Sequence, residues 1–277
     1  MPSLAERLGY GADDRLLILN CDDLGFCHSA NEGVYESLRR GIGTSASLMV
    51  PCPWAPGAAR CYDGEDVGVH LTLTSEWEPY RWGPLTASPS LVDEQRRLPR
   101  TSEAVWGRAA IDDVRRELRA QVDQALAWGI DVTHLDAHMG TVQVRPEFFS
   151  VYLELAAAYR LPMRLSGAES EAILGFPFRG PAAEKGVTFT DHFIHAPGVA
   201  SRSILIELLP KLRPGVTEAY LHPAVDSPEL RAAAPDWERR VDDHRLLVHD
   251  DEVQKLLDAH GIQLIGFRAL RECMRSA

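Results

Sequence analysis

An apolar run that ends in two adjacent carboxylates constrains this chain more than any other stretch. Residues 16–25 read Leu-Leu-Ile-Leu-Asn-Cys-Asp-Asp-Leu-Gly, and a short apolar run bounded by polar residues is typical of a buried β-strand. The strand carries Asp22 and Asp23 to its carboxyl end, where Gly25 lets the backbone turn sharply. Adjacent residues leaving a strand point in different directions, so the two side chains can serve different roles. An ordinary strand followed by an Asx turn gives the same pattern.

Apolar runs and helical periodicities alternate along the rest of the chain. The periodicity predicts further strands over residues 44–50, 67–73, 132–136, 163–165, 215–222 and 262–267. It predicts helices over residues 29–41, 55–61, 111–128, 147–159, 201–212 and 250–260. Repeated strand-then-helix units favour a parallel sheet with helices outside, and a closed or partly closed barrel over an open sheet. No repeat or linker divides the chain, so we expect a single domain over residues 1–277.

Two stretches do not fit the alternation. Residues 75–107 form a long loop insertion that carries Trp77, Tyr80 and Trp82, and connections of this length are usually lids or binding loops. Residues 167–186 have no clear periodicity, so we expect them to be irregular.

The composition excludes several classes of partner. A net charge of -11 and a pI near 5.4 argue against a nucleic-acid partner, because phosphate neutralisation needs clustered Lys and Arg. No apolar run reaches membrane-spanning length, and the first residues lack the pattern of a signal peptide. The five cysteines form no Cys-x-x-Cys pair, so neither a disulfide framework nor a thiolate zinc site is indicated. We therefore expect a cytoplasmic, soluble protein of enzyme size.

Chemistry-bearing side chains gather at three predicted strand ends. After the Asp22-Asp23 pair come His70, and then His134-x-Asp136-x-His138. A set of one Asp and two His with open positions suits a catalytic divalent metal, whose bound water a nearby carboxylate can deprotonate for attack on a carbonyl. Each cluster alone has a simpler interpretation, because a strand histidine is often a hydrogen-bonded core residue. Three clusters at equivalent strand ends favour the metal site.

The order of these motifs resembles a known family. Residues 19–25, 68–73 and 133–138 resemble the three ordered motifs of the YdjC-like carbohydrate deacetylases, which include diacetylchitooligosaccharide and hopanoid-associated deacetylases. A late His-Pro at His222-Pro223 fits the same pattern. The resemblance implies a distorted (β/α) barrel, often a homodimer, that uses a divalent metal to remove acetyl groups from N-acetylated sugars.

The resemblance also implies roles for individual residues. Asp23, His70 and His138 match the metal ligands, and Asp22 matches the general base. His222 matches the late histidine that protonates the departing amine or stabilises the oxyanion. Two imidazoles and one carboxylate suit a single Zn²⁺, while Mg²⁺, Mn²⁺ and Co²⁺ stay open.

The remaining polar and aromatic candidates have competing interpretations. Arg164 either orients Asp22 and contacts substrate or forms a surface or structural ion pair. His134 and Asp136 either contact substrate or tie a loop. The aromatic residues Trp77 and Trp82 either stack on a sugar ring, form a small local core or cover a dimer interface. His192 and His195 are expected in a loop near the site.

One departure from the family pattern leaves the substrate open. His138 is followed by Met139-Gly140-Thr141-Val142, where many family members carry a His-rich run. The expected substrate is a small acetylated amino-sugar or short oligosaccharide. Two alternatives stay open: a metal-dependent amidase or esterase acting on a non-chitin substrate, and a non-catalytic sugar-binding relative.

Overall fold

A ten-residue strand at the centre of one parallel sheet organises the fold. The computed structural model describes residues 2–78, 80–195 and 198–276, and within them seven strands form this sheet. The strands are β1 (Arg15–Leu24), β2 (Ser45–Leu48), β3 (Val67–Leu71), β4 (Leu135–Ala137), β5 (His192–Ile194), β6 (Gly215–Leu221) and β7 (Ile262–Leu264).

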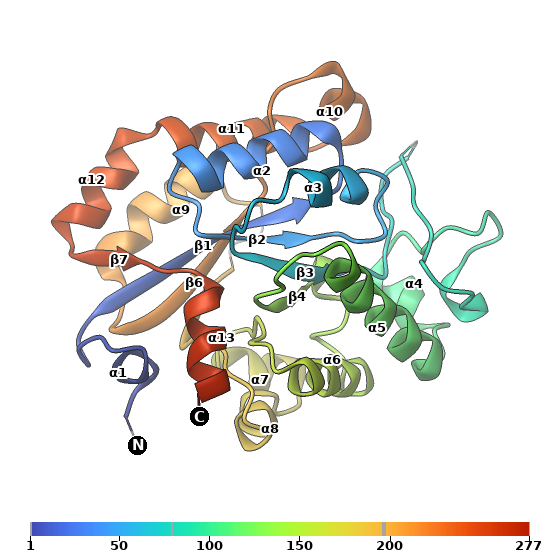
Figure 1. Ribbon diagram of the computed structural model, residues 1–277, viewed down its shortest axis with the longest axis horizontal. Helices are drawn as coiled ribbons and strands as arrows, with labels where there is room; N and C mark the ends of the chain where they lie inside the picture. The colour runs from blue at the N-terminus through green and yellow to red at the C-terminus, as the bar shows by residue number, and fades with distance from the viewer. Residues whose placement is uncertain (1, 79, 196–197, 277) are drawn as a thin grey trace.

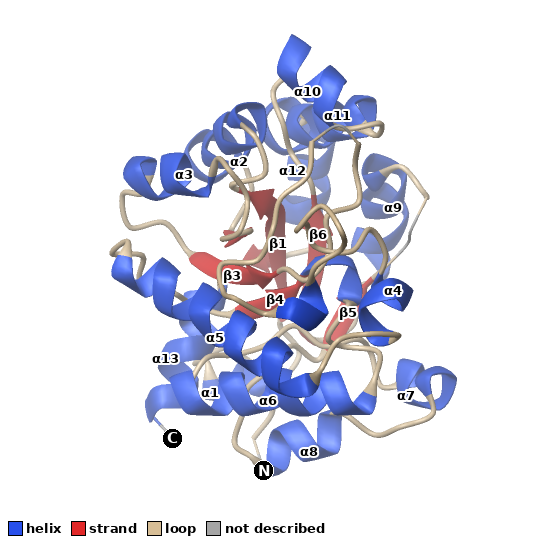
Figure 2. Cartoon of the chain, turned by 90° about the vertical axis from the view of Figure 1, so that its right-hand side faces the viewer, coloured by secondary structure: helices blue, strands red, loops and turns tan. Residues whose placement is uncertain are grey.

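Helices cover the outside of the sheet (Figure 1 and Figure 2). The first half of the chain contributes α1 (Leu4–Arg7), α2 (His28–Arg40), α3 (Ala55–Cys61), α4 (Ser102–Trp106), α5 (Ile111–Ala127) and α6 (Pro146–Tyr159). The second half contributes α7 (Glu169–Leu174), α8 (Arg179–Glu184), α9 (Ser201–Leu208), α10 (Pro228–Ala233), α11 (Trp237–His249), α12 (Asp251–Ala259) and α13 (Phe267–Ser276). Short 3₁₀ turns lie at η1 (Pro89–Leu91), η2 (His138–Gly140) and η3 (Leu209–Lys211).

Strand β1 holds the sheet together because it pairs along both edges. Strand β6 pairs with it over residues 15–21. On the other edge, β7 pairs with the first half of β1 and β2 with the second half. Every pairing is parallel, so the strand carboxyl ends meet at one edge of the sheet. This edge faces the viewer in Figure 2.

The sheet curls into most of a barrel. Its strand order is β4-β3-β2-β1-β6-β5. Beyond β4, a parallel bridge joins Leu135 to Met163, and the amide of Met163 donates to the carbonyl of Thr188, which continues the curl. The predicted fold class, a distorted (β/α) barrel with parallel strands, is confirmed.

Both faces of β1 are buried, which explains its unbroken apolar sequence. Leu17, Leu19 and Cys21 pack into the main core. Leu16 and Ile18 point the other way, into a smaller cluster with α1 and α13. A strand buried on both faces cannot alternate apolar and polar residues, so this run predicted the most central element of the fold.

The long segment over residues 75–107 is fixed to the barrel by buried carboxylates of α5. Glu117 accepts hydrogen bonds from the backbone amides of Leu85 and Thr86 at 3.0 and 2.9 Å. One turn earlier, Asp113 accepts from the amide and hydroxyl of Ser90. These bonds hold the segment against α5, so it is an ordered strap rather than an open connection.

Four sequence-based expectations need correction. Residues 163–165 form a single bridge and not a strand, and residues 167–186 contain the short helices α7 and α8. The last strand ends at Leu264, because Phe267 begins α13 and is buried in the smaller core cluster. Helices α10 and α11 occupy a stretch to which the periodicity assigned nothing.

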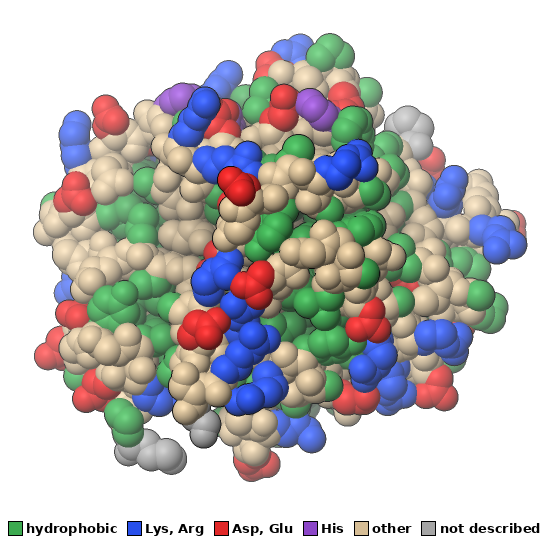
Figure 3. Space-filling view, in the orientation of Figure 1, with side chains coloured by type: hydrophobic (Ala, Val, Ile, Leu, Met, Phe, Trp, Pro, Cys, Tyr) green, Lys and Arg blue, Asp and Glu red, His purple; other side chains and the backbone are tan. Residues whose placement is uncertain are grey.

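The surface carries both signs of charge. On the face in Figure 3, acidic and basic side chains are interspersed, and the basic side chains over α13 have acidic neighbours. Within the described ranges, no helix combines the length and the apolar character needed to cross a bilayer.

Two leucines of α5 provide a matched test of the packing. Leu118 is fully buried whereas Leu126 is 44% exposed on the same helix. We expect Leu118→Ala to lower the free energy of unfolding by about 2–5 kcal/mol, because it leaves a cavity in the core. Leu126→Ala should change it by about 0.5 kcal/mol or less. Urea unfolding measures both, and equal losses would contradict this placement of α5.

Candidate metal centre and active site

Three side chains from separate strand ends converge on one point. Oδ1 of Asp23 at the end of β1 lies 3.4 Å from Nε2 of His70 in β3 and 3.4 Å from Nδ1 of His138. The two imidazole nitrogens are 3.3 Å apart. All three residues are buried, and their donor atoms are close enough to share one ion.

The backbone at Asp22 and Asp23 separates the two carboxylates. The pairing of β1 with β2 shifts register between Cys21 and Leu24, and Asp23 has a φ of 67°. This left-handed conformation is costly for a residue other than glycine and is found mostly where function requires it. Gly25 follows with a φ of 90°, and a Cβ there would lie 2.9 Å from Leu48. The turn therefore requires glycine, as its position in the sequence predicted.

Asp23, His70 and His138 form a triangle of metal-binding candidates, and each of them is held by a second partner on the side away from the other two. Nδ1 of His70 is 2.6 Å from Oδ1 of Asp136, and Nε2 of His138 is 2.8 Å from Oε1 of Glu76. Nη1 of Arg240 donates to Oδ2 of Asp23 at 2.9 Å. Carboxylates in this position fix the orientation of metal-binding imidazoles and make them better ligands.

The geometry of the triangle fits a bound cation. Bonds of about 2.0–2.1 Å at tetrahedral angles separate neighbouring donor atoms by about 3.3–3.4 Å, which matches the observed edges of 3.3 and 3.4 Å. Oδ1 of Asp23 is buried and accepts no hydrogen bond from the described residues, so its lone pairs are available. The three residues present can therefore hold a divalent cation.

Strong interactions with neighbouring charges set the protonation of the triangle. Burial disfavours the charged imidazoles, but the carboxylate of Asp136 outweighs this and raises the pKa of His70 to about 10. In the same way, Glu76 and Asp23 raise the pKa of His138 to about 9. Burial opposes ionisation of Asp23, yet Arg240 and the two histidines hold its pKa well below the usual range. A cation must displace the protons of the two imidazoles when it binds.

Asp22 lies beside the triangle and is held by a buried arginine. Nη1 and Nη2 of Arg164 donate to the two carboxylate oxygens of Asp22 at 2.8 Å each. Asn20 donates to Oδ1 of Asp22 as well, at 2.7 Å. The contact expected between Arg164 and Asp22 is present, and because Arg164 is buried, this ion pair is structural and does not lie at the surface.

Glu218 is the second anchor of Arg164. Nε of Arg164 donates to Oε1 of Glu218 at 2.6 Å, in the interior of the barrel. Burial raises the pKa of Glu218 to about 7 even though the guanidinium of Arg164 favours its charged form. The planar fork of Arg164 thus bridges two buried carboxyl groups, which fixes the plane of the Asp22 carboxylate.

A cavity of about 370 Å³ opens over the triangle. Its lining includes the charged and imidazole side chains of Asp22, Asp23, His70, His138, Arg164 and Arg240. Its walls add aromatic and imidazole side chains, namely Trp77, Phe193, His195, Tyr220 and His222. Tyr220 is 2.8 Å from Nδ1 of His195 and packs edge-on against His222, whose pKa is lowered by burial. A cavity that combines an apolar wall with several polar groups is the arrangement expected for binding a small polar ligand.

Several candidate substrate contacts lie elsewhere. His134 is fully buried and stacks on Phe267 at 3.9 Å, so it does not reach the cavity. Trp82 is also buried, because this part of the strap packs into the core, and of the two tryptophans only Trp77 lines the cavity. Asp136 is buried behind His70 and orients that ring instead of meeting a ligand. His192 belongs to β5 and bonds the carbonyl of Pro214, away from the site.

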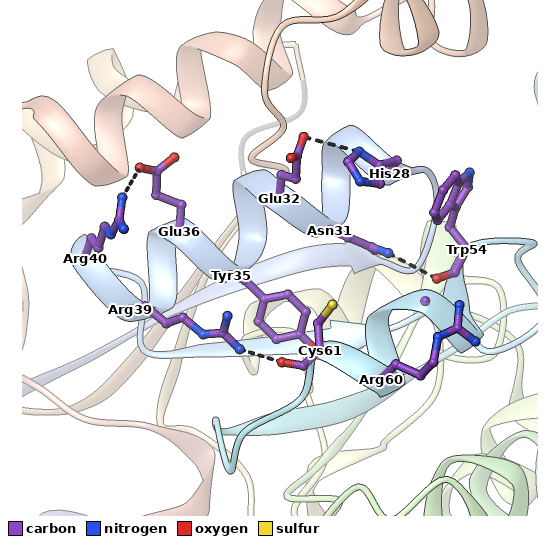
Figure 4. A pocket seen from close by; sticks show the side chains of 11 residues that line it. His28, Asn31, Glu32, Tyr35, Glu36, Arg39, Arg40, Trp54, Arg60 and Cys61 are labelled. Atoms are coloured by element: carbon purple, nitrogen blue, oxygen red, sulfur yellow. Dashed lines mark hydrogen bonds and ion pairs between the residues drawn. The ribbon is translucent and has the colours of Figure 1, made fainter.

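The cavity at the strand ends is not the largest hollow in the described residues, since one of about 990 Å³ lies beside α9 and α11. A groove of about 480 Å³ lies between α2 and α3, with Tyr35 and Trp54 among its lining residues (Figure 4). Several of its charged groups are paired with one another, as His28 is with Glu32 and Arg40 with Glu36. It contains no member of the triangle. The chemistry therefore lies in the smaller cavity at the strand ends.

Comparisons with known proteins agree with this architecture. The model of the family described as YdjC-like protein matches residues 16–259. A protein from Thermus thermophilus named carbohydrate deacetylase is 41% identical, over 98% of this chain and 99% of its own length. Another of that name, from Geobacillus stearothermophilus, is 33% identical over 92% of this chain and 97% of its own length. The chain belongs to the YdjC-like family.

A solved structure shares the fold. A "putative cellobiose-phosphate cleavage protein" from Enterococcus faecalis V583 superposes with a TM-score of 0.80 at 24% identity, over 93% of this chain and 99% of that one. This likeness concerns the arrangement of strands and helices.

The carboxylate behind His70 can be tested by its effect on metal binding. We expect Asp136→Asn to weaken Zn²⁺ binding by about 10–100-fold, because the ring of His70 loses the partner that orients it. Asp113→Asn is the matched control, since Asp113 is a buried aspartate that bonds Ser90 far from the triangle. Competition titration with a chromogenic chelator measures both affinities. Equal affinities in the two variants would contradict the role of Asp136.

Proposed function

We propose that this protein is a metal-dependent hydrolase that removes the acetyl group from an N-acetylated amino-sugar or short oligosaccharide. One observation carries the proposal: the buried triangle of Asp23, His70 and His138 lies beside an aspartate whose carboxylate Arg164 holds in place. A binding protein has no need of a fixed carboxylate next to a metal position. The names of the relatives from Thermus and Geobacillus support the acetylated-sugar substrate.

The cation and the protein residues have separate tasks in this reaction. A divalent cation held by the triangle would polarise the acetyl carbonyl and acidify water. Asp22 accepts the proton of the attacking water, and the bidentate pair with Arg164 holds its carboxylate in a fixed orientation. His222 at the cavity wall delivers a proton to the departing nitrogen.

The bonds and protons of the reaction balance with these groups. The oxygen of water forms a bond to the carbonyl carbon, and the amide C–N bond then breaks. The proton that Asp22 takes from water is passed to His222, whose neutral imidazole hands a proton on to the departing nitrogen, so both groups end as they began. The products are acetate and the free amino-sugar.

The donor set favours Zn²⁺ over Mg²⁺. Two imidazoles and one carboxylate suit Zn²⁺ better than a cation that prefers oxygen ligands. We propose one Zn²⁺ per chain, with residues 1–277 as one catalytic unit. The homodimer and the cytoplasmic location stay predictions.

A second enzymatic function is favoured by the mouth of the cavity. Met139 follows His138 with a φ of 53° and is half exposed at the cavity edge, where it presents an apolar surface. An apolar rim admits amides or esters other than chitin fragments. The same cation, Asp22 and His222 would serve that reaction.

Replacing Asp22 separates metal binding from turnover. We expect Asp22→Asn to lower kcat by about 10²–10⁴-fold, because the amide cannot accept the proton of water. Its metal content should equal that of the wild type, because Asp23, His70 and His138 keep all of their ligand atoms in this variant. Acetate release and elemental analysis measure the two quantities. A fully active variant would show that another group is the base.

Metal removal and a substrate panel distinguish the candidate functions. We expect a strong chelator to abolish acetate release and Zn²⁺ to restore it. The panel should contain N-acetylated monosaccharides, chito-oligosaccharides, simple acetamides and acetate esters. Turnover of the sugars supports the proposed function, whereas turnover of simple amides or esters alone supports the second one. Bound metal without turnover of any compound, or no metal at all, would contradict the proposal.

A further inference from the structure

A buried arginine from the far end of the chain reaches the candidate metal ligand Asp23. Arg240 lies on α11, and its Nη1 donates to Oδ2 of Asp23 at 2.9 Å. Its side chain is only 3% exposed. A charge buried to this extent needs a partner of opposite charge, and the carboxylate of Asp23 supplies it. The pairing leaves Oδ1 of Asp23 as the one oxygen of this carboxylate that faces His70 and His138.

Arg240 is itself held rigidly from several directions. Its Nε donates to both carboxylate oxygens of Asp236, one helical turn earlier, at 3.1 Å each. The guanidinium lies over the rings of Phe26 and Trp77, at 5.3 and 5.0 Å from their centroids. With Nε bonded to Asp236 and the guanidinium packed against two rings, Nη1 has a fixed direction toward Asp23. Such a group can determine which carboxylate oxygen stays free.

We propose that Arg240 is a positioning residue that restricts Asp23 to one metal-binding oxygen. This inference rests on the metal site of the proposed function. A carboxylate can bind a cation through one oxygen or through both. Because Arg240 occupies Oδ2, Asp23 contributes a single bond, and a four-coordinate cation keeps one position open for water and substrate. The left-handed backbone of Asp23 and this ion pair together fix the direction of Oδ1.

The proposal predicts a specific change when the guanidinium is removed. In Arg240→Met, Oδ2 of Asp23 loses its partner and becomes free to join Oδ1 on the cation. We expect Co²⁺ in place of Zn²⁺ to change from a four-coordinate to a five-coordinate visible spectrum, which is weaker. Zn²⁺ affinity should be retained or rise, because a nearby positive charge is lost and a ligand atom is gained. Turnover should fall by about 10–100-fold.

Three further variants separate positioning from a general structural effect. Arg271→Met is the matched control: Arg271 is also buried and ion-paired, but it bonds Asp131 from α13 and does not line the cavity. Arg240→Lys keeps a cation near Oδ2 and should restore most of the four-coordinate spectrum. Asp236→Asn loosens Arg240 from a half-exposed position and should shift the spectrum part of the way. This mild variant keeps the test available if Arg240→Met does not fold.

The outcomes distinguish this inference from the proposed function. Spectra that match between wild type and Arg240→Met, or Zn²⁺ affinity that falls about ten-fold or more with an unchanged spectrum, would overturn the role of Arg240. A rise in KM alone, with the spectrum unchanged, would make Arg240 a substrate contact and would overturn it as well. If wild-type protein binds neither Co²⁺ nor Zn²⁺ at the triangle, the proposed function itself fails.

Discussion

The site depends on the parallel pairing of the strands, which brings distant residues to one edge of the sheet. Asp23 and His70 lie near the ends of β1 and β3, and His138 follows β4; these strands run in the same direction in a curled sheet. Parallel strands end together, so side chains at their carboxyl ends meet without any long excursion of the chain. The ten-residue β1 holds this arrangement because it pairs along both of its edges. The candidate metal centre is thus a direct consequence of sheet topology.

Collecting so many charges in the interior is costly, and the structure offsets the cost by pairing them. Asp22 and Glu218 share Arg164, Asp23 is paired with Arg240, and the two imidazoles have their own carboxylates. Buried ion pairs rarely stabilise a fold more than apolar residues of similar volume would. Their presence, together with the left-handed backbone at Asp23 and Met139, indicates that this region is shaped by function at the expense of stability. The apolar core around β1 supplies the stability that the site lacks.

The sequence predicted the parts of the site that depend on local pattern. Strands with carboxylate or imidazole residues at their ends were recognisable from periodicity, and parallel topology then required those ends to meet. Arg240 and Glu76 were missed because no local pattern marks them: one lies on a helix in an unassigned stretch, and the other lies in the strap. Their positions depend on tertiary packing of distant segments. The sequence did mark the long strap as a functional connection, and that signal could have directed a search for a site residue such as Glu76 there.

His134 was a candidate substrate contact but does not reach the cavity, and the alternation of side chains along a strand does not explain why. In an extended strand, His134 would face the same side as His138. The strand begins only at Leu135, and Gly68 allows the ring of His134 to pack closely, since a Cβ on Gly68 would lie 2.5 Å from Nδ1 of His134. The ring then stacks on Phe267, in a helix the periodicity did not predict. Close packing against distant residues thus decided the role of a residue that its spacing had assigned to the site.

Diffraction data collected at the zinc absorption edge, from crystals grown with Zn²⁺, would test the central claim most directly. The account predicts one strong anomalous peak per chain, within bonding distance of Oδ1 of Asp23, Nε2 of His70 and Nδ1 of His138, with Asp22 outside the coordination sphere. Anomalous density only elsewhere, or three side chains that point away from a common ion, would contradict it.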